Sequence, residues 1–469
     1  MRARQLIMFM NARVTAMELA SVFSPADVKA YLARTGVTLP SVCEGFAYSG
    51  SYAGRNIEKM YELGRLEGSL ENAVQACFRN GKAKHVLVTS GFYVLHTHGG
   101  NDAKHPGIQA GSCETDGPLG ALALVRAFAC RGVYVSLYCE PHNGPVLRAG
   151  YAAMVGFYDE AAPAMAARLR SHTRCLPDAT DGTAEAVSAE FAATYATLYP
   201  EDPIPTSASL RSRAARSSFE LGKSLMSAWG LESTPSRSQD GVKPRKIPRT
   251  QLVSGTDSAP GRVDTLFAIE RLSAPYRNIR GRDIGADTEP IDALWPMASP
   301  AESTAAAQSM ASFAEENGVL PPPAALRELA YIAPDAVSFG IGDGGNEVGM
   351  GKITCIDTIS VLSPGGEFAP IHINGAHRTC DHLILGTVSN WAGTAFEAAA
   401  HVLYPHNALD YGAERNAVAV ELALLDAIMA QPAGSVDGKY HEQPRSVDGL
   451  AWEPFHREFY ENLWGLTKE

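Results

Sequence analysis

The sequence predicts an α/β fold in which helices flank a mostly parallel sheet in Rossmann-like layers. Short apolar runs such as residues 85–90 are rich in β-branched side chains and end at glycine, as buried parallel strands do. These runs alternate with longer helical patterns, which is typical of βαβ units. Glycine and polar residues gather directly after the runs, where open α/β sheets bind their ligands.

The first predicted βαβ unit joins a strand at 85–91 to a strand at 133–138. A helical pattern over 57–78, broken at Gly64 and Gly68, precedes it. Residues 117–131 are apolar on nearly every side, which indicates a buried helix. Asp116 is placed to cap this helix and Pro118 suits its first turn, while a polar loop is expected over 96–113.

The second half of the chain supplies three more predicted strands and the helices between and after them. The strands are expected at 265–269, 337–341 and 383–388. Helices are expected at 391–403, 417–429 and 453–463, and two earlier ones at 19–33 and 183–199. Because helices separate the strands throughout, the sheet is expected to be mostly parallel.

A length of 469 residues predicts two or three domains, or one large domain with insertions. We expect a helical segment at 1–80 and an α/β catalytic domain in two parts, 81–200 and 263–469. Between them, residues 203–262 carry ten Lys and Arg against four Asp and Glu, with little apolar periodicity. A basic linker or surface insertion is the favoured interpretation. A patch for RNA, another partner or a membrane surface is the alternative, although only two aromatic residues, Phe219 and Trp229, lie among the charges.

Composition excludes several classes of protein. Hydrophobic residues make up 45% and charged residues 19%, so a folded core is expected rather than disorder. A net charge of −11 argues against a whole-chain nucleic-acid binder, and no apolar run is long enough to predict a membrane span. Eight cysteines without a CxxC pair or regular spacing predict neither a disulfide framework nor structural zinc.

The first 17 residues are basic and contain no acid. This pattern is compatible with a mitochondrial presequence, and an ordinary first helix or frayed terminus is an equal alternative. A mitochondrial location is therefore expected, with a cytoplasmic one as the alternative. The sequence leaves the oligomeric state open, a homo-oligomer included.

Four segments place polar residues at the predicted carboxyl ends of strands: 114–121, 270–271 with 277–283, 340–352, and 389–391. The third has six glycines between 340 and 351, interleaved with Asp343, Asn346 and Glu347. Glycine lets the backbone approach a ligand closely, so this segment predicts a site for a small ligand or a metal. It matches neither a dinucleotide fingerprint nor a P-loop, because Gly345 comes one position too early and Ile353 replaces Ser or Thr.

Four acids are candidate ligands of a divalent cation, Mg²⁺ or Mn²⁺, because hard cations prefer carboxylate oxygens. They are Glu114, Asp116, Asp343 and Glu347. A simple helix cap is the competing role for Asp116, and the two roles are compatible. His96, His98 and His105 could ligate a transition metal, but an ordinary polar loop is favoured there.

Five motifs, in order along the chain, resemble those of the D-glutamate cyclase C-terminal-like family. They are ETDGPLGA (114–121), YRNIRG (276–281), IGDGGNEVGMG (341–351), DHLI (381–384) and SNW (389–391). The resemblance implies an α/β fold and a lyase that converts D-glutamate to 5-oxo-D-proline with loss of water. It also implies a divalent metal in some members and, as in the vertebrate enzymes, a mitochondrial location. Ile279 stands where methionine is common in the family.

Cyclisation of glutamate requires the α-amine to attack the γ-carboxyl, so a site must remove a proton, neutralise the carboxylate and hold a curled substrate. Our hypothesis assigns catalysis to Asp343, Glu347, Asn346, Asp116 and Arg280. The metal would polarise the γ-carboxylate, and one of the acids or a metal-bound hydroxide would be the general base. Arg280 or Arg271 would pair with the α-carboxylate. The remaining substrate-binding residues are Asn278, Gly117, Gly344, Gly345, Ser389 and Asn390.

Two other functions stay open for the same residues. One is a metal-dependent hydrolase acting on a small phosphate or amide. The other is a non-catalytic protein that binds a small molecule through the glycine-rich loop.

Overall fold

The computed structural model describes residues 57–96, 109–176, 263–271, 336–405 and 413–467, apart from short gaps at 65, 67, 92, 140–142, 346, 354–359, 363–367, 371–378, 432–434 and 438–444. The helices expected at 19–33 and 183–199, the basic stretch 203–262 and the first 17 residues lie outside these ranges. The division of the chain into domains therefore stays a prediction.

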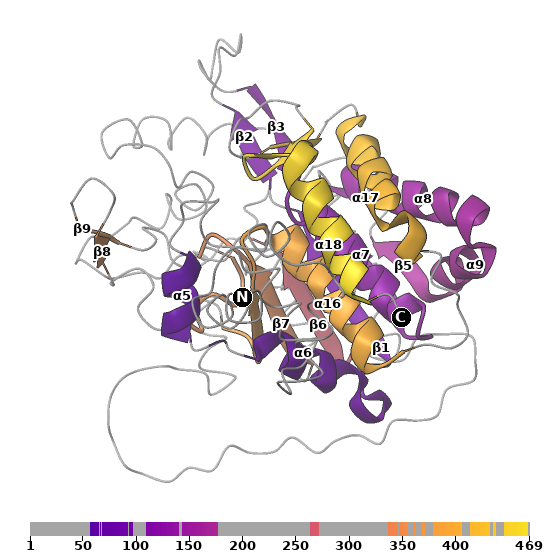
Figure 1. Ribbon diagram of the computed structural model, residues 1–469, viewed down its shortest axis with the longest axis horizontal. Helices are drawn as coiled ribbons and strands as arrows, with labels where there is room; N and C mark the ends of the chain where they lie inside the picture. The colour runs from indigo at the N-terminus through magenta and orange to yellow at the C-terminus, as the bar shows by residue number, and fades with distance from the viewer. Residues whose placement is uncertain are drawn as a thin grey trace, which may run out of the picture.

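A six-stranded parallel sheet forms the centre of the molecule, in the order β10-β7-β6-β1-β4-β5 (Figure 1). The strands are β1 (His85–Ser90), β4 (Tyr134–Tyr138), β5 (Thr173–Leu176), β6 (Thr265–Ile269), β7 (Val337–Gly342) and β10 (His382–Leu385). Numbered along the chain, this order is 3-2-1-4-5-6, the order of dinucleotide-binding α/β folds. The predicted fold class is confirmed. All carboxyl ends meet at one edge, and the strand order reverses between β1 and β6.

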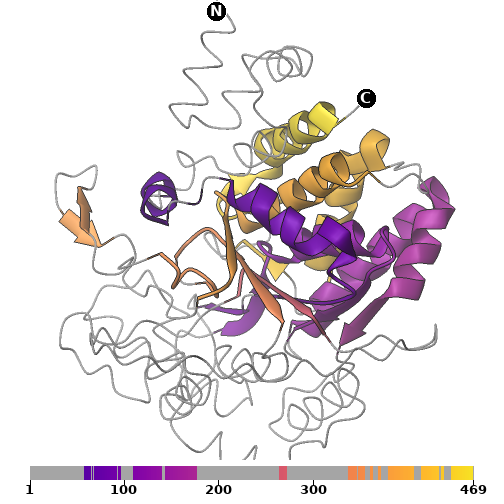
Figure 2. The ribbon, with the colours of Figure 1, turned by 90° about the horizontal axis from the view of Figure 1, so that it is seen from below.

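Helices cover this sheet in layers. The helices are α5 (Ile57–Gly64), α6 (Ser69–Phe78), α7 (Pro118–Ala129), α8 (Gly144–Ala161), α9 (Pro163–His172), α16 (Ser389–Leu403), α17 (Ala413–Met429) and α18 (Arg457–Thr467). Of these, α6, α7 and α16 contact the strands, whereas α17 packs on α8 and α18. Apart from α5, the helices from the first half (indigo and purple) and from the end of the chain (orange and yellow) gather on the same side of the strands (Figure 2). No helix in the described part is long and apolar enough to cross a membrane.

The core lies between α7, α16 and the sheet. Every residue of α7 is buried, as its uniformly apolar sequence predicts. Phe128 of α7, Phe267 of β6 and Phe396 of α16 pack together, with ring centroids 5.2–5.8 Å apart. The two helices cross at Gly120 and Gly393, where a Cβ on Gly393 would lie 2.7 Å from the Cα of Gly120. This backbone contact requires glycine on both helices.

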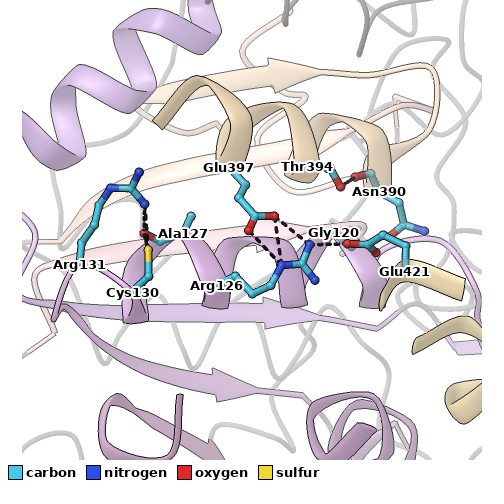
Figure 3. Close-up of polar contacts among 9 residues, drawn as sticks. All are labelled: Gly120, Arg126, Ala127, Cys130, Arg131, Asn390, Thr394, Glu397 and Glu421. Carbon is cyan, nitrogen blue, oxygen red and sulfur yellow. Dashed lines mark hydrogen bonds and ion pairs between the residues drawn. The ribbon is translucent and has the colours of Figure 1, made fainter. Parts of the chain in front are cut away.

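A buried ion cluster joins three helices next to this crossing (Figure 3). Arg126 of α7 donates from Nε to both carboxylate oxygens of Glu397 of α16, at 2.9 and 3.2 Å. Its Nη2 donates to Glu397 at 2.8 Å and also to Glu421 of α17. None of the three side chains is more than 2% exposed, so one guanidinium holds two carboxylates inside the core.

The described part also contains smaller elements, of which the sequence predicted only the turn Trp452–His456, as part of a helix at 453–463. A second sheet has the order β11-β3-β2, from β2 (Tyr93–His96), β3 (Gln109–Glu114) and β11 (Ser435–Val436). A hairpin of β12 (Ser446–Val447) and β13 (Leu450–Ala451) leads through a π-helical turn, Trp452–His456, into α18. A separate pair consists of β8 (Ser360–Leu362) and β9 (Phe368–Pro370), and a 3₁₀ turn, Arg79–Gly81, follows α6. The loop expected over 96–113 therefore ends in a strand that runs directly into the acidic motif.

Candidate active site

Three carboxylates from separate loops converge at the carboxyl edge of the sheet. Glu270 directly follows β6, Asp343 directly follows β7, and Asp116 lies just before α7. One oxygen atom from each lies within 4.8 Å of the others, and none of the three residues is more than 4% exposed. We call Asp116, Glu270 and Asp343 the acidic triad. It lies next to the point between β1 and β6 where the strand order reverses, the usual ligand position of this fold.

The electrostatics of the acidic triad favour a bound proton or cation. Burial raises the pKa of Asp116, although hydrogen bonds from Asp343 and from backbone N–H groups oppose this shift. Burial, and then the negative charges of Glu347, Asp116 and Glu114, raise the pKa of Glu270 well above its usual range. Like charges held together in a dry site cannot all stay ionised without compensation. A cluster that offers carboxylate oxygens alone fits a hard divalent cation, which the triad residues could hold.

Asp116 and Asn390 cap each other's helices. Asp116 Oδ1 accepts from the N–H of Asn390 at 2.8 Å, and its Oδ2 accepts from the N–H of Ser389 at 2.9 Å, at the start of α16. Asn390 Oδ1 accepts in turn from the N–H groups of Gly117 and Gly120 at 2.9 and 2.8 Å, at the start of α7. Asp116 was expected at the N-cap of its own helix and instead lies one residue before it, where its Oδ1 also accepts from the N–H of Gly117 at 2.9 Å. Gly117 occupies that N-cap, with a φ of 95°, and the Asp116 carboxylate lies against the first turn of α16.

Close packing at Gly117 and a hydrogen bond from Ser389 fix the position of Glu270. A Cβ on Gly117 would lie 2.6 Å from the Cβ of Glu270, so this position accepts only glycine. The Oγ of Ser389 donates to Oε2 of Glu270 at 2.5 Å. Since Asp116 binds the backbone N–H of the same serine, the first turn of α16 orients two of the three carboxylates.

Glu347 holds the glycine-rich loop closed. Its carboxylate accepts hydrogen bonds from the N–H groups of Asp343, Gly344 and Gly345, at 3.2, 2.6 and 2.7 Å. The glycine N–H groups therefore point to a carboxylate of the chain itself. This arrangement fixes the backbone that carries Asp343, which makes Glu347 a positioning residue in the structure.

Arg271 brings a positive charge to the same edge. Its Nη1 donates to the carbonyl oxygens of Ser90 and Gly91, at 3.2 and 2.7 Å, so the ends of β6 and β1 are tied together. Burial lowers the pKa of Arg271 to about 10, and the guanidinium stays charged at neutral pH. A cation therefore lies one residue away from the acid Glu270.

Comparison with known protein families shows to which family the chain belongs. The family described as D-glutamate cyclase-like, C-terminal, matches residues 49–309 and 323–464. The chain belongs to this D-glutamate cyclase-like family. The matched residues include every strand of the central sheet and the whole acidic triad, and they extend beyond the five motifs to α5 and α17. No curated protein matches the chain individually.

The structure of this D-glutamate cyclase-like domain brings most of the predicted site residues into one region. These are Glu114, Asp116, Gly117, Arg271, Asp343, Gly344, Gly345, Glu347, Ser389 and Asn390. Arg280, Asn278, Asn346, His98 and His105 lie outside the described residues. Glu114 and Glu347 are near Glu270 but outside the acidic triad.

Glu270 is the residue that the predicted ligand set lacked. The sequence carried the signal for it, because Glu270 directly follows a predicted strand, as Asp343 does. The position of a residue at a strand end was therefore a better guide than membership in the longest acidic motifs.

Proposed function

We propose that this protein is a lyase that cyclises D-glutamate to 5-oxo-D-proline with loss of water. The observation that carries the proposal is the buried acidic triad, with the Arg271 guanidinium beside it, in a chain of the D-glutamate cyclase-like family. An amino dicarboxylic acid has an ammonium group and carboxylates, and this edge of the sheet offers the complementary charges. The localisation that goes with the proposal is mitochondrial.

In the reaction, a bond forms between the α-nitrogen and the γ-carbon, and one carbon–oxygen bond of the γ-carboxylate breaks. Of the three ammonium protons, one stays on the lactam nitrogen and two leave with the oxygen as water. Glu270 is suited to accept and return such a proton, because burial and neighbouring acids raise its pKa well above the usual range of a glutamate. Ser389 holds its Oε2, so the carboxyl group keeps one orientation during the transfer.

Asp116 and Asp343 complete the acidic side of the site, and with Glu270 they would hold a divalent cation, Mg²⁺ or Mn²⁺. When bound, such a cation supplies Lewis-acid polarisation of the γ-carboxylate. Asp116 is held by the first turn of α16, and the loop of Asp343 is held by Glu347. Arg271 faces a substrate carboxylate, and we retain Asn278, Arg280 and Asn346 as proposed substrate residues.

A mass-resolved turnover assay on D- and L-glutamate, with and without Mn²⁺ or Mg²⁺, tests the proposal. We expect 5-oxoproline from the D-isomer alone, with turnover that depends on the metal. Asp343→Asn should abolish turnover and leave the circular dichroism spectrum unchanged. Asp426→Asn is the matched control, because Asp426 is 42% exposed and pairs with Arg445 away from the site.

Unchanged turnover in Asp343→Asn would contradict the assignment. Release of phosphate or ammonia from a substrate panel would instead favour the metal-dependent hydrolase, for which a buried acidic triad is equally suitable. Tight binding of a small molecule without turnover would favour a binding protein.

A further inference from the structure

Asn143 is a buried polar residue whose side chain has no hydrogen-bond partner among the described residues. It occupies the N-cap of α8 and is 1% exposed, yet its side chain does not cap the helix. Within the described part of the chain, neither its Oδ1 nor its Nδ2 has a hydrogen-bond partner. An unpaired buried amide destabilises a fold, so a residue of this kind points to a partner supplied by a ligand.

The side chain of Asn143 lies at the carboxyl edge of the sheet, near the acidic triad. A Cβ on Gly91, directly after β1, would lie 2.9 Å from Asn143 Nδ2. The preceding residue, Ser90, is fully buried, and its Oγ also lacks a partner among the described residues. That Oγ lies 2.8 Å from the position of a Cβ on Gly117, which in turn would contact Glu270. The end of β1 therefore connects Asn143 to the acidic triad.

The surroundings of Asn143 are electropositive. The Nη1 of Arg271 donates to the carbonyl oxygen of Gly91, the residue whose Cβ position lies against the Asn143 side chain. The guanidinium of Arg148 lies over the first turn of α8, since a Cβ on Gly144 would be 3.0 Å from its Nη1. The 18-residue helix α8 begins here, and the N-terminus of a long helix attracts anions. The residues around Asn143 are thus positively charged, whereas the acidic triad is negatively charged.

We propose that Asn143, the N-terminus of α8 and Arg271 form a subsite for the α-carbon end of an amino-acid substrate. The proposal rests on the proposed function and deepens it. Nδ2 donates to the α-carboxylate, next to the guanidinium and the helix N-terminus. Oδ1 accepts from the ammonium group on the same carbon. One amide thereby recognises both groups that define an α-amino acid, and the γ-carboxyl extends toward the acidic triad.

The test compares the full-length wild type with Asn143→Leu, which has a similar volume and no polar atoms. The probe is D-norvaline, which has the α-carboxylate and the ammonium group but no γ-carboxylate, so it cannot cyclise. Its binding is measured by isothermal titration calorimetry. We expect Asn143→Leu to bind D-norvaline about tenfold more weakly or worse, and to raise the KM for D-glutamate similarly. The thermal midpoint should be unchanged or higher, because an unpaired buried amide is removed.

Asn72→Leu is the matched control, since Asn72 is exposed on α6, and it should bind like the wild type. Asn143→Asp keeps the size of the side chain and adds a negative charge, so it should weaken D-norvaline binding further. This variant takes the place of Asn143→Leu in the test if Asn143→Leu does not fold. Unchanged binding in the variant that folds, or no binding of D-norvaline by the wild type, would overturn the subsite. A purely structural role would lower the midpoint and leave binding unchanged. If the wild type binds D-norvaline through Asn143 but does not convert D-glutamate, the subsite stands and the proposed reaction fails.

Discussion

Replacing Arg126 by methionine should leave two carboxylates inside the protein without their cationic partner. In the wild type, the guanidinium makes three hydrogen bonds to Glu397, at 2.8–3.2 Å, and a further one to Glu421. All three side chains are at most 2% exposed, so water cannot replace the lost partner. Removing one partner of a buried ion pair destabilises by about 3–5 kcal/mol. We expect the free energy of unfolding of Arg126→Met to fall by this amount.

Arg457 offers a control with the same chemistry on the surface. Its Nη1 pairs with Glu453 at 3.0 Å and its Nε with Glu461 at 2.9 Å, and the three side chains are 51–61% exposed. Exposed pairs contribute about 0–1 kcal/mol, so Arg457→Met should change stability little. The assay is urea unfolding at pH 8, followed by tryptophan fluorescence.

A triple variant with Arg126→Met, Glu397→Leu and Glu421→Leu removes all three charges and should recover most of the lost stability. Equal losses in Arg126→Met and Arg457→Met would refute the reasoning, because the buried cluster would then behave like a surface pair. Failure of the triple variant to recover would refute it as well.

Three further predictions concern the helices around the site. Burial raises the pKa of Glu421 to about 7, so the folded state binds this proton more tightly than the unfolded state. Stability should therefore decrease as pH rises from about 4.5 to 7, and Glu421→Gln should flatten that profile in urea titrations at pH 5, 6 and 8. Asn390→Ala removes the partner of the Gly120 N–H and of the Thr115 carbonyl oxygen, while the Gly117 N–H keeps its second acceptor, Asp116 Oδ1. This variant should lose about 2–5 kcal/mol of stability and turn over substrate more slowly. If its urea midpoint equalled that of the wild type, the reciprocal capping by Asp116 and Asn390 would be contradicted. Gly393→Ala should lower the thermal midpoint, because its Cβ would lie 2.7 Å from the backbone of Gly120. Gly156→Ala, with no atom within 4 Å of the new Cβ, should instead raise stability by up to about 1 kcal/mol. A Gly393→Ala variant more stable than Gly156→Ala would contradict the close helix packing at Gly393.

The sequence predicted those parts of the fold that depend on buried, continuous apolar runs. β1 is buried at all six residues and α7 on every side, and both were expected within a residue or two of their observed bounds. β5 was not expected, because a short edge strand such as Thr173–Leu176 has no apolar run. The second sheet was missed for a related reason, since its strands β3 and β11 are far apart in the chain.

In the site, residues at strand ends were predictable and long-range pairings were not. Asp343 follows a strand and opens a glycine-rich loop, which are local signals. Asp116 caps a helix that begins 273 residues later, and no local pattern encodes that contact. Glu347 is next to the same glycines, but only the folded loop shows that its carboxylate accepts their N–H groups. The lack of a partner for Asn143 is likewise a property of the assembled core.

We propose that the acidic triad performs the chemistry, with Glu270 as the residue that moves the proton. The most direct measurement is the rate of 5-oxoproline formation from D-glutamate by the wild type and by Glu270→Gln, each at saturating Mn²⁺. We predict turnover of the D-isomer by the wild type, and a loss of about 10²–10⁴-fold in Glu270→Gln with the fold intact. A Glu270→Gln variant as active as the wild type, or equal turnover of L-glutamate, would contradict the account.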